Sequence, residues 1–287
     1  MYKTFNFPIE CCSPQTPLND PRLIETELGL YISDADPKIE ETYEAFESIE
    51  IIPSLIEIVE RIRKREDEHH WKDDYNINLA LKWIKKWGYL KAEKDTDLIG
   101  KNLHGQRVSG FLQEADKFYD FWALYRAAVN RDIEQLKSVI DVMEDPELPF
   151  AATHTFYFFA NQYVEYKGYT NGIFVIEQPL QSYQNAAIDF LLRVIEQYIN
   201  NHDLYARTIR LESSKEKDSF MVSPGMAFPD LLDALYMQFF ILLNENEKKI
   251  CPVCNKPFIP ERIDKKYCSN TCKLTAYRKR QNTKKII

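Results

Sequence analysis

The stretch ICPVCNKPFIPERIDKKYCSNTCKLTAYRKRQ, residues 250–281, holds four of the six cysteines of this 287-residue chain. They form two close pairs, Cys251 with Cys254 and Cys268 with Cys272, separated by thirteen residues. Two such pairs joined by a loop can place four thiolates at the corners of a tetrahedron, as in structural zinc sites. The spacing therefore predicts one zinc ion on these cysteines, in preference to an iron–sulfur cluster or four unrelated thiols.

The same stretch predicts a small metal-dependent fold. All four ligand positions are filled by sulfur, so no position remains for water or substrate, and we expect a structural rather than a catalytic ion. About forty residues bury too little apolar surface to fold unaided, and the ion would supply the missing stability. We expect Phe258 and Tyr267 to form a small core, residues 255–267 a short hairpin, and the second pair to open a helix capped by Ser269 or Asn270.

Charge is divided unevenly along the chain. Residues 248–287 hold 12 of the 37 lysines and arginines but only 2 of the 44 acidic residues, so they carry +10 while the remaining residues carry −17. A basic segment of this kind favours an anionic partner. The alternative is that the basic segment folds back onto the acidic remainder of its own chain.

The basic residues follow a helical spacing after the last cysteine. Lysine and arginine at this density neutralise phosphates and release counterions, and a tyrosine among them can stack on or hydrogen-bond to a nucleotide. The competing interpretation is a solvated, solubilising terminus. We predict nucleic-acid contacts by Arg262, Lys265, Lys266, Lys273, Tyr277, Arg278, Lys279, Arg280 and Lys284.

Apolar periodicity predicts a helical remainder. The expected helices cover residues 37–66, divided by Pro53, then about 80–87, 114–142, about 187–198 and 230–243. Strand signals are fewer: a hairpin or edge strand at Ile173–Ile176 and a further strand at 204–212. Residues 95–110 are expected to form a polar loop, and 150–166 fit either a buried helix or a strand.

These patterns define the expected fold class, which is mainly α with a minor β element (α+β). We expect a helical domain over residues 1–247, with a regulatory, sensor or dimerisation role, followed by a finger over residues 248–287. The first residues contain no apolar run typical of a signal peptide, and no segment is long and apolar enough to span a membrane. We therefore expect a cytoplasmic protein with reduced cysteines.

Catalytic motifs are not evident. The sequence contains no phosphate-binding glycine-rich loop, no nucleophile elbow and no His-Glu-x-x-His stretch, so we do not expect an enzyme. A site within the aromatic-rich helical part stays open as an alternative.

The order CPVC, a basic loop, KYCSNTC and YRKR resembles treble-clef-like zinc fingers, and most closely the C-terminal finger of the bacterial CGNR zinc-finger proteins. In that family a mostly helical ABATE domain precedes the finger. The resemblance covers about residues 225–282 and extends loosely over 110–225. It implies zinc ligation by the four cysteines and DNA binding by the finger. The family's Cys-Gly-Asn-Arg motif is absent: CKLT, Cys272 to Thr275, stands in its place, and Arg278 and Arg280 follow one turn later.

The favoured function is therefore a DNA-binding transcription regulator. The rival interpretation is an adaptor whose finger binds RNA or a protein partner. A homodimer is attractive, because one small finger gives little affinity for DNA by itself.

Overall fold

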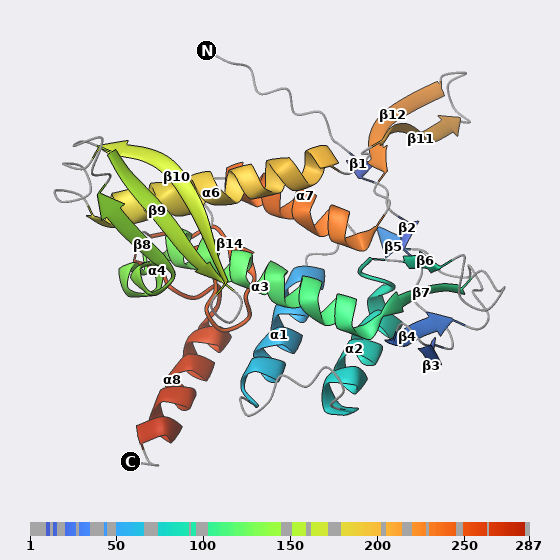
Figure 1. Cartoon of the computed structure of the whole chain (residues 1–287), viewed down its shortest axis with the longest axis horizontal. Helices are drawn as coiled ribbons and strands as arrows, with labels where there is room; N and C mark the ends of the chain where they lie inside the picture. The colour runs from blue at the N-terminus through green and yellow to red at the C-terminus, as the bar shows by residue number, and fades with distance from the viewer. Residues whose placement is uncertain are drawn as a thin grey trace. The chain divides into compact units, whose positions relative to one another are not determined.

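Helices and small, mostly antiparallel sheets make up the computed structural model of the chain (Figure 1). Helices contain more of the described residues than strands do, which confirms the prediction of a mainly α fold with a minor β element. The structure describes residues 10–11, 14–15, 21–26, 29–34, 43–44, 50–65, 74–91, 93–95, 103–144, 151–158, 162–171, 179–201, 205–213, 220–227, 230–244, 249–262 and 264–284.

The helices are α1 (Ile51–Arg63), α2 (Asp74–Trp87), α3 (Val108–Asn130), α4 (Ile133–Val139), α6 (Pro179–Asn201), α7 (Leu231–Asn244) and α8 (Asn270–Lys284). No helix in the described part of the chain has both the length and the apolar character needed to cross a membrane.

The strands that the structure describes belong to five sheets, and only the β1–β12 pair is parallel among these pairings. The four-stranded sheet has the order β3 (Pro21–Thr26), β4 (Gly29–Asp34), β7 (Leu103–Arg107), β6 (Glu93–Asp95). The three-stranded sheets are β1 (Glu10–Cys11), β12 (Phe220–Ala227), β11 (Tyr205–Ser213), and β10 (Gln162–Asn171), β9 (Ala151–Phe158), β8 (Ile140–Glu144). The two-stranded sheets are β2 (Pro14–Gln15) with β5 (Tyr43–Glu44), and β13 (Lys249–Ile250) with β14 (Pro257–Phe258).

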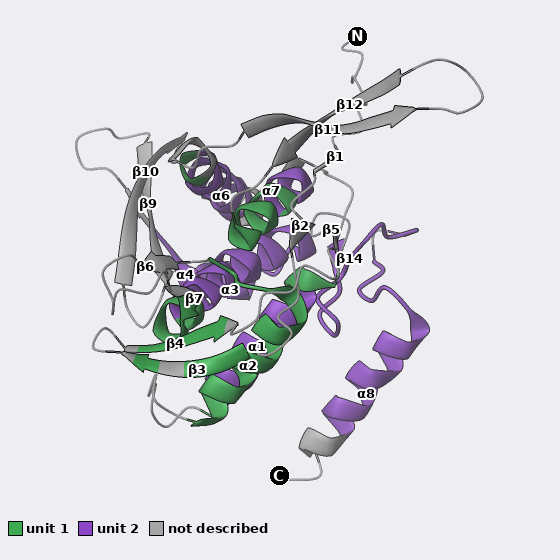
Figure 2. Ribbon diagram, turned by 90° about the vertical axis from the view of Figure 1, so that its right-hand side faces the viewer, with its two compact units in different colours: residues 1–52, 65–112, 197–238 green, residues 53–64, 113–196, 239–287 purple. Residues whose placement is uncertain are grey.

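The chain divides into two compact units, coloured in Figure 2. Unit 1 comprises residues 1–52, 65–112 and 197–238, and unit 2 comprises residues 53–64, 113–196 and 239–287. The finger falls in unit 2. The predicted domain boundary at residues 247/248 stays a prediction.

Unit 1 contains the four-stranded sheet, in which β4 and β7 pair closely. Tyr31 is buried opposite Arg107, and its hydroxyl accepts hydrogen bonds from Nε and Nη2 of that arginine at 3.0 and 2.7 Å. Two positions further along the pairing, Gly105 lies opposite Ser33 and so near β4 that a Cβ there would be 2.7 Å from the Ile32 carbonyl oxygen. Glycine is required because strand β7 would otherwise be pushed off its neighbour.

Unit 2 has an aromatic core along α3. Phe118, Trp122 and Tyr125 pack their rings against Phe239 of α7, with ring centroids 5.3–5.8 Å apart. The Tyr125 hydroxyl donates to the Leu242 carbonyl at 2.9 Å, which satisfies its polar end inside the core. The aromatic periodicity of this helix therefore serves packing.

The prediction of helix over residues 37–66 is only partly correct. Within that range the structure describes a short strand, β5, and one helix, α1, while residues 35–42 and 45–49 lie outside the described residues. Pro53 does not divide two helices: it is the third residue of α1. Proline is tolerated in a first helical turn, because the amide it lacks would have no intrahelical acceptor there.

The single helix predicted over 114–142 is two helices. Arg131 adopts a left-handed conformation (φ 58°) after α3 ends, and the Asp132 carboxylate then caps α4 by accepting from the Gln135 amide at 3.1 Å. From Ile140 onward the chain continues as strand β8. An N-cap aspartate inside a continuous apolar period was the local signal for this break.

The remaining expectations are mixed. Helices α2 and α6 include the helices expected at about 80–87 and 187–198 but begin earlier, and Gly88, with φ 87°, directly follows α2. Helix α7 and strand β11 match the expected helix and strand. The polar loop over 95–110 is wrong in part, because it contains β7 and the start of α3. Residues 150–166 resolve largely as strands β9 and β10. The predicted strand Ile173–Ile176 lies outside the described residues.

Candidate metal centre

The first cysteine pair lies on a tight knuckle between two short strands. Strands β13 and β14 pair antiparallel, Lys249 with Phe258, so the chain reverses across Cys251 and Cys254. The Cys251 amide donates to the Lys256 carbonyl at 3.0 Å, and the Asn255 amide donates to the Cys251 carbonyl at 2.9 Å. The hairpin therefore encloses the first pair, and the prediction of a hairpin between the two pairs, over 255–267, is wrong.

The second pair lies at the start of α8. Cys268 precedes the helix and Cys272 is in its first turn. The Ser269 hydroxyl accepts a hydrogen bond from the Cys272 amide at 3.2 Å, and the Ser269 carbonyl accepts from Lys273 at 3.1 Å. Ser269 is thus the N-cap, one of the two residues predicted for that role.

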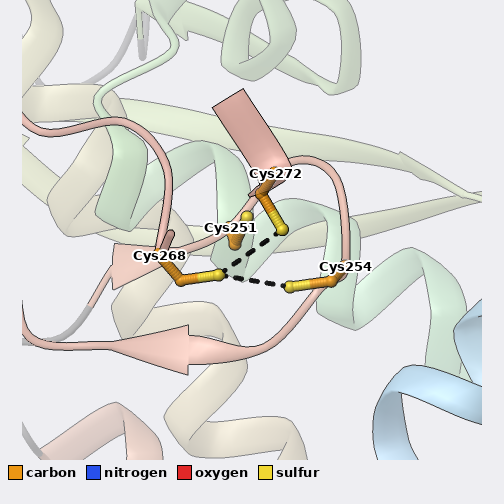
Figure 3. A group of neighbouring side chains, drawn as sticks. All are labelled: Cys251, Cys254, Cys268 and Cys272. Atoms are coloured by element: carbon orange, nitrogen blue, oxygen red, sulfur yellow. Dashed lines mark hydrogen bonds between the residues drawn. The ribbon is translucent and has the colours of Figure 1, made fainter. Parts of the chain in front are cut away.

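The four sulfurs form one cluster, and their side chains turn toward one another (Figure 3). The ligand atoms all lie within 4.8 Å of one another, with the Cys268 sulfur 3.5 Å from that of Cys254 and 3.6 Å from that of Cys272. A tetrahedral ion with metal–sulfur bonds of about 2.3 Å requires sulfurs about 3.8 Å apart. The donor set and the spacing therefore fit a four-coordinate metal ion.

Electrostatics also favours a cation at this place. Burial acts to raise the pKa of the Cys251 thiol, but the backbone amides of Cys268, Cys254 and Val253 outweigh it and bring that pKa down to about 7. Burial raises the pKa of the Cys254 and Cys268 thiols. One thiolate is thus formed readily, whereas further negative charge on packed sulfurs needs a compensating positive ion.

The finger has little apolar core of its own. Phe258 and Tyr267, the predicted core pair, are both only half-buried, whereas Ile250 and Cys251 are fully buried. Few apolar contacts are therefore available to hold the knuckle and α8 together. A metal–sulfur cross-link is the interaction best placed to do so.

Within unit 2, the knuckle contacts α1 and α3 through polar side chains. Asn255 bonds to Arg126 and to Glu60, and Asn130 donates to the Ile250 carbonyl at 2.9 Å. Sequence reasoning missed these residues. The only local signal was an asparagine directly after the CPVC turn, a residue type that tolerates the left-handed conformation seen there (φ 55°).

The residues predicted to contact nucleic acid are mostly exposed. Lys266, Lys273, Arg278, Lys279 and Arg280 are exposed, and Tyr277 is 54% exposed. Two cations near the loop have acidic neighbours: Arg262 lies 3.6 Å from Asp264, and half-buried Lys265 lies 3.3 Å from Glu261. The side chain of Lys284 lies outside the described residues.

Comparisons with protein-family models, with curated proteins and with solved structures found no match for this chain. The resemblance to CGNR fingers therefore rests on the cysteine motif and its flanking residues alone.

Proposed function

We propose that Cys251, Cys254, Cys268 and Cys272 hold one structural zinc ion, which organises the finger as a nucleic-acid-binding module. The support is an all-sulfur donor set with tetrahedral spacing, within a segment that has little apolar core. Four thiolates leave no open coordination position, so the ion supplies stability and no reaction chemistry.

The observation that carries the nucleic-acid assignment is the composition of α8. Its fifteen residues, NTCKLTAYRKRQNTK, contain five lysines and arginines and no acidic residue. On a helix, Lys273, Tyr277 and Arg280 share one face because they recur at intervals of four and three. A helix of this kind fits the major groove of duplex DNA, where its cations neutralise phosphates.

DNA is the preferred partner and transcription regulation the preferred role. The resemblance of the cysteine motif to CGNR fingers supports this choice. The motif's missing Asn and Arg are compensated in this proposal by Arg278 and Arg280, which are exposed one turn further along α8. Arg262 and Lys265 contribute less, because binding a phosphate requires each to leave an acidic neighbour.

Fluorescence anisotropy of the zinc-loaded full-length protein on a duplex from random-site selection tests this function. We expect binding to weaken steeply with salt, and a Lys273→Ala/Arg280→Ala variant to reduce the slope of log K against log salt by about 2. The matched control is Arg193→Ala, which removes an exposed arginine of α6 paired with Asp189. Equal binding by all three proteins contradicts the assignment of α8.

A protein-binding adaptor is the second candidate, and one observation favours it. Leu274 and Tyr277 on α8 are each 54% exposed, as is usual for apolar anchors of a helix that docks in a partner's groove. In that case Leu274→Ser abolishes capture of the partner, while duplex DNA gives no salt-dependent binding.

A further inference from the structure

One asparagine joins the metal knuckle to two helices of unit 2. Asn255 is only 5% exposed. Its Oδ1 accepts a hydrogen bond from Arg126 Nη1 of α3 at 2.8 Å, and its Nδ2 donates to Glu60 Oε1 of α1 at 3.4 Å. The oxygen of the amide is therefore hydrogen-bonded to α3 and its nitrogen to α1.

The two partners of Asn255, Arg126 and Glu60, also contact each other. Arg126 Nη1 also lies 3.7 Å from Glu60 Oε1, and the two side chains are 17% and 29% exposed. One turn further along the same face of α3, Asn130 donates to the carbonyl of buried Ile250. The knuckle is thus held at two points by neighbouring side chains of one helix.

The two contact points flank the first cysteine pair. Ile250 immediately precedes Cys251, and Asn255 immediately follows Cys254. Backbone hydrogen bonds across the knuckle and the left-handed conformation of Asn255 fix the positions of the two cysteines and of the Asn255 side chain at the same time. The turn that presents two sulfurs to the second pair is therefore the turn that presents Asn255 to α3 and α1.

We infer that metal binding by the four cysteines is coupled to the stability of α1 and α3, with Asn255 as the positioning residue that carries the coupling. This inference rests on the metal site proposed above. Because linkage is reciprocal, an ion that fixes the knuckle strengthens its contacts with the helices, and these contacts in turn raise the affinity for the ion.

The test measures zinc affinity of the full-length protein by competition with a chromophoric chelator. Asn255→Gly removes the amide but keeps the left-handed backbone at no steric cost. We expect zinc to bind about tenfold more weakly to this variant, the loss that a buried charge-assisted hydrogen bond produces. Gln281→Ala, which truncates an exposed amide of α8, is the control and leaves the affinity unchanged.

Two further variants separate coupling from a local effect of glycine. In an Arg126→Met background, Asn255→Gly weakens zinc binding by less than it does in the wild type, because the shared contact is already lost. The double variant Asn255→Asp/Glu60→Gln exchanges the amide and the carboxylate between the two positions. We expect it to bind zinc almost as tightly as the wild type, and more tightly than Asn255→Asp alone. Strictly additive losses, or no rescue by the exchange, overturn the role of Asn255.

Hydrogen exchange of the wild-type protein requires no variant. Adding zinc to the metal-free chain slows exchange at residues 115–130 of α3, and chelation reverses this. If one zinc binds but exchange in α3 is unchanged, the coupling is wrong while the metal site stands. If no zinc binds, the metal site fails, and the coupling fails with it.

Discussion

At the residue scale, Arg63 is the most highly connected charge in the described part of α1. Its guanidinium lies 2.7 Å from Asp116 and 2.8 Å from Asp120, both on α3, and over the Tyr119 ring. Burial acts to lower the pKa of Arg63, but its hydrogen bond to Asp116 and the charge of Asp120 outweigh burial and raise that pKa. The ion pair is partly shielded from water, since Asp120 is only 11% exposed.

We predict that Arg63→Met lowers the free energy of unfolding by about 2 kcal/mol, because it removes the guanidinium that both Asp116 and Asp120 contact at the helix interface. The matched control is Arg61→Met on the same helix. Its partner Glu57 is more than half exposed, so the change is below about 0.5 kcal/mol. Urea unfolding followed by circular dichroism measures both, and equal losses contradict the account of Arg63.

The structural roles of some residues can be predicted from the sequence, whereas those of others cannot. The four cysteines and the Ser269 cap were predictable because their partners lie within a few residues or in a fixed spacing. Asn255 was not, because Arg126 is 129 positions away and no local pattern relates the two. Sequence patterns of this kind report neighbours along the chain and leave long-range polar contacts undetermined.

At the element scale, the proposed metal cross-link is the main connection between the two parts of the finger. The knuckle between β13 and β14 and the helix α8 are connected by half-buried residues and by the four sulfurs. Helix α8 is exposed at most of its described positions, so packing contributes little to its stability. A short isolated helix is marginal in water, and anchoring of its first turn decides whether it forms.

We predict that Cys268→Ser abolishes stoichiometric zinc binding and unfolds α8. Trypsin then cuts at Arg278–Arg280 much faster than in the zinc-loaded wild type, while most of the helical signal in the far-ultraviolet persists at low temperature. Cys12→Ser, which changes a cysteine that is not part of the two spaced pairs in the sequence, leaves zinc content and cleavage unchanged. An unaltered cleavage pattern in Cys268→Ser contradicts metal-dependent folding of the finger.

Helices were easier to predict than strands. Helix α2 buries one apolar face, and helix α7 is apolar and largely buried. Both patterns can be recognised from the order of residues in the sequence. Strand β7, LHGQR, carries no alternating apolar pattern, and its place depends on pairing with Tyr31, Ile32 and Ser33 about seventy residues earlier. Pairing between distant segments decides such strands, so local propensity does not reveal them.

At the scale of the whole molecule, opposite charges are segregated along the chain. Residues 248–287 carry +10 and the remainder carries −17. Contacts with the rest of unit 2 engage the knuckle through Asn255 and Ile250, whereas the cations of α8 lie exposed further along. This separation allows the finger to be fixed at one end and to present a positive helix at the other.

The most direct test is native mass spectrometry of the purified full-length protein, combined with elemental analysis. We expect a mass increment of one zinc ion per chain, lost on chelation together with the protease resistance of α8. A metal-free chain whose residues 249–284 resist protease would contradict it, as would a different metal in the cysteine cluster.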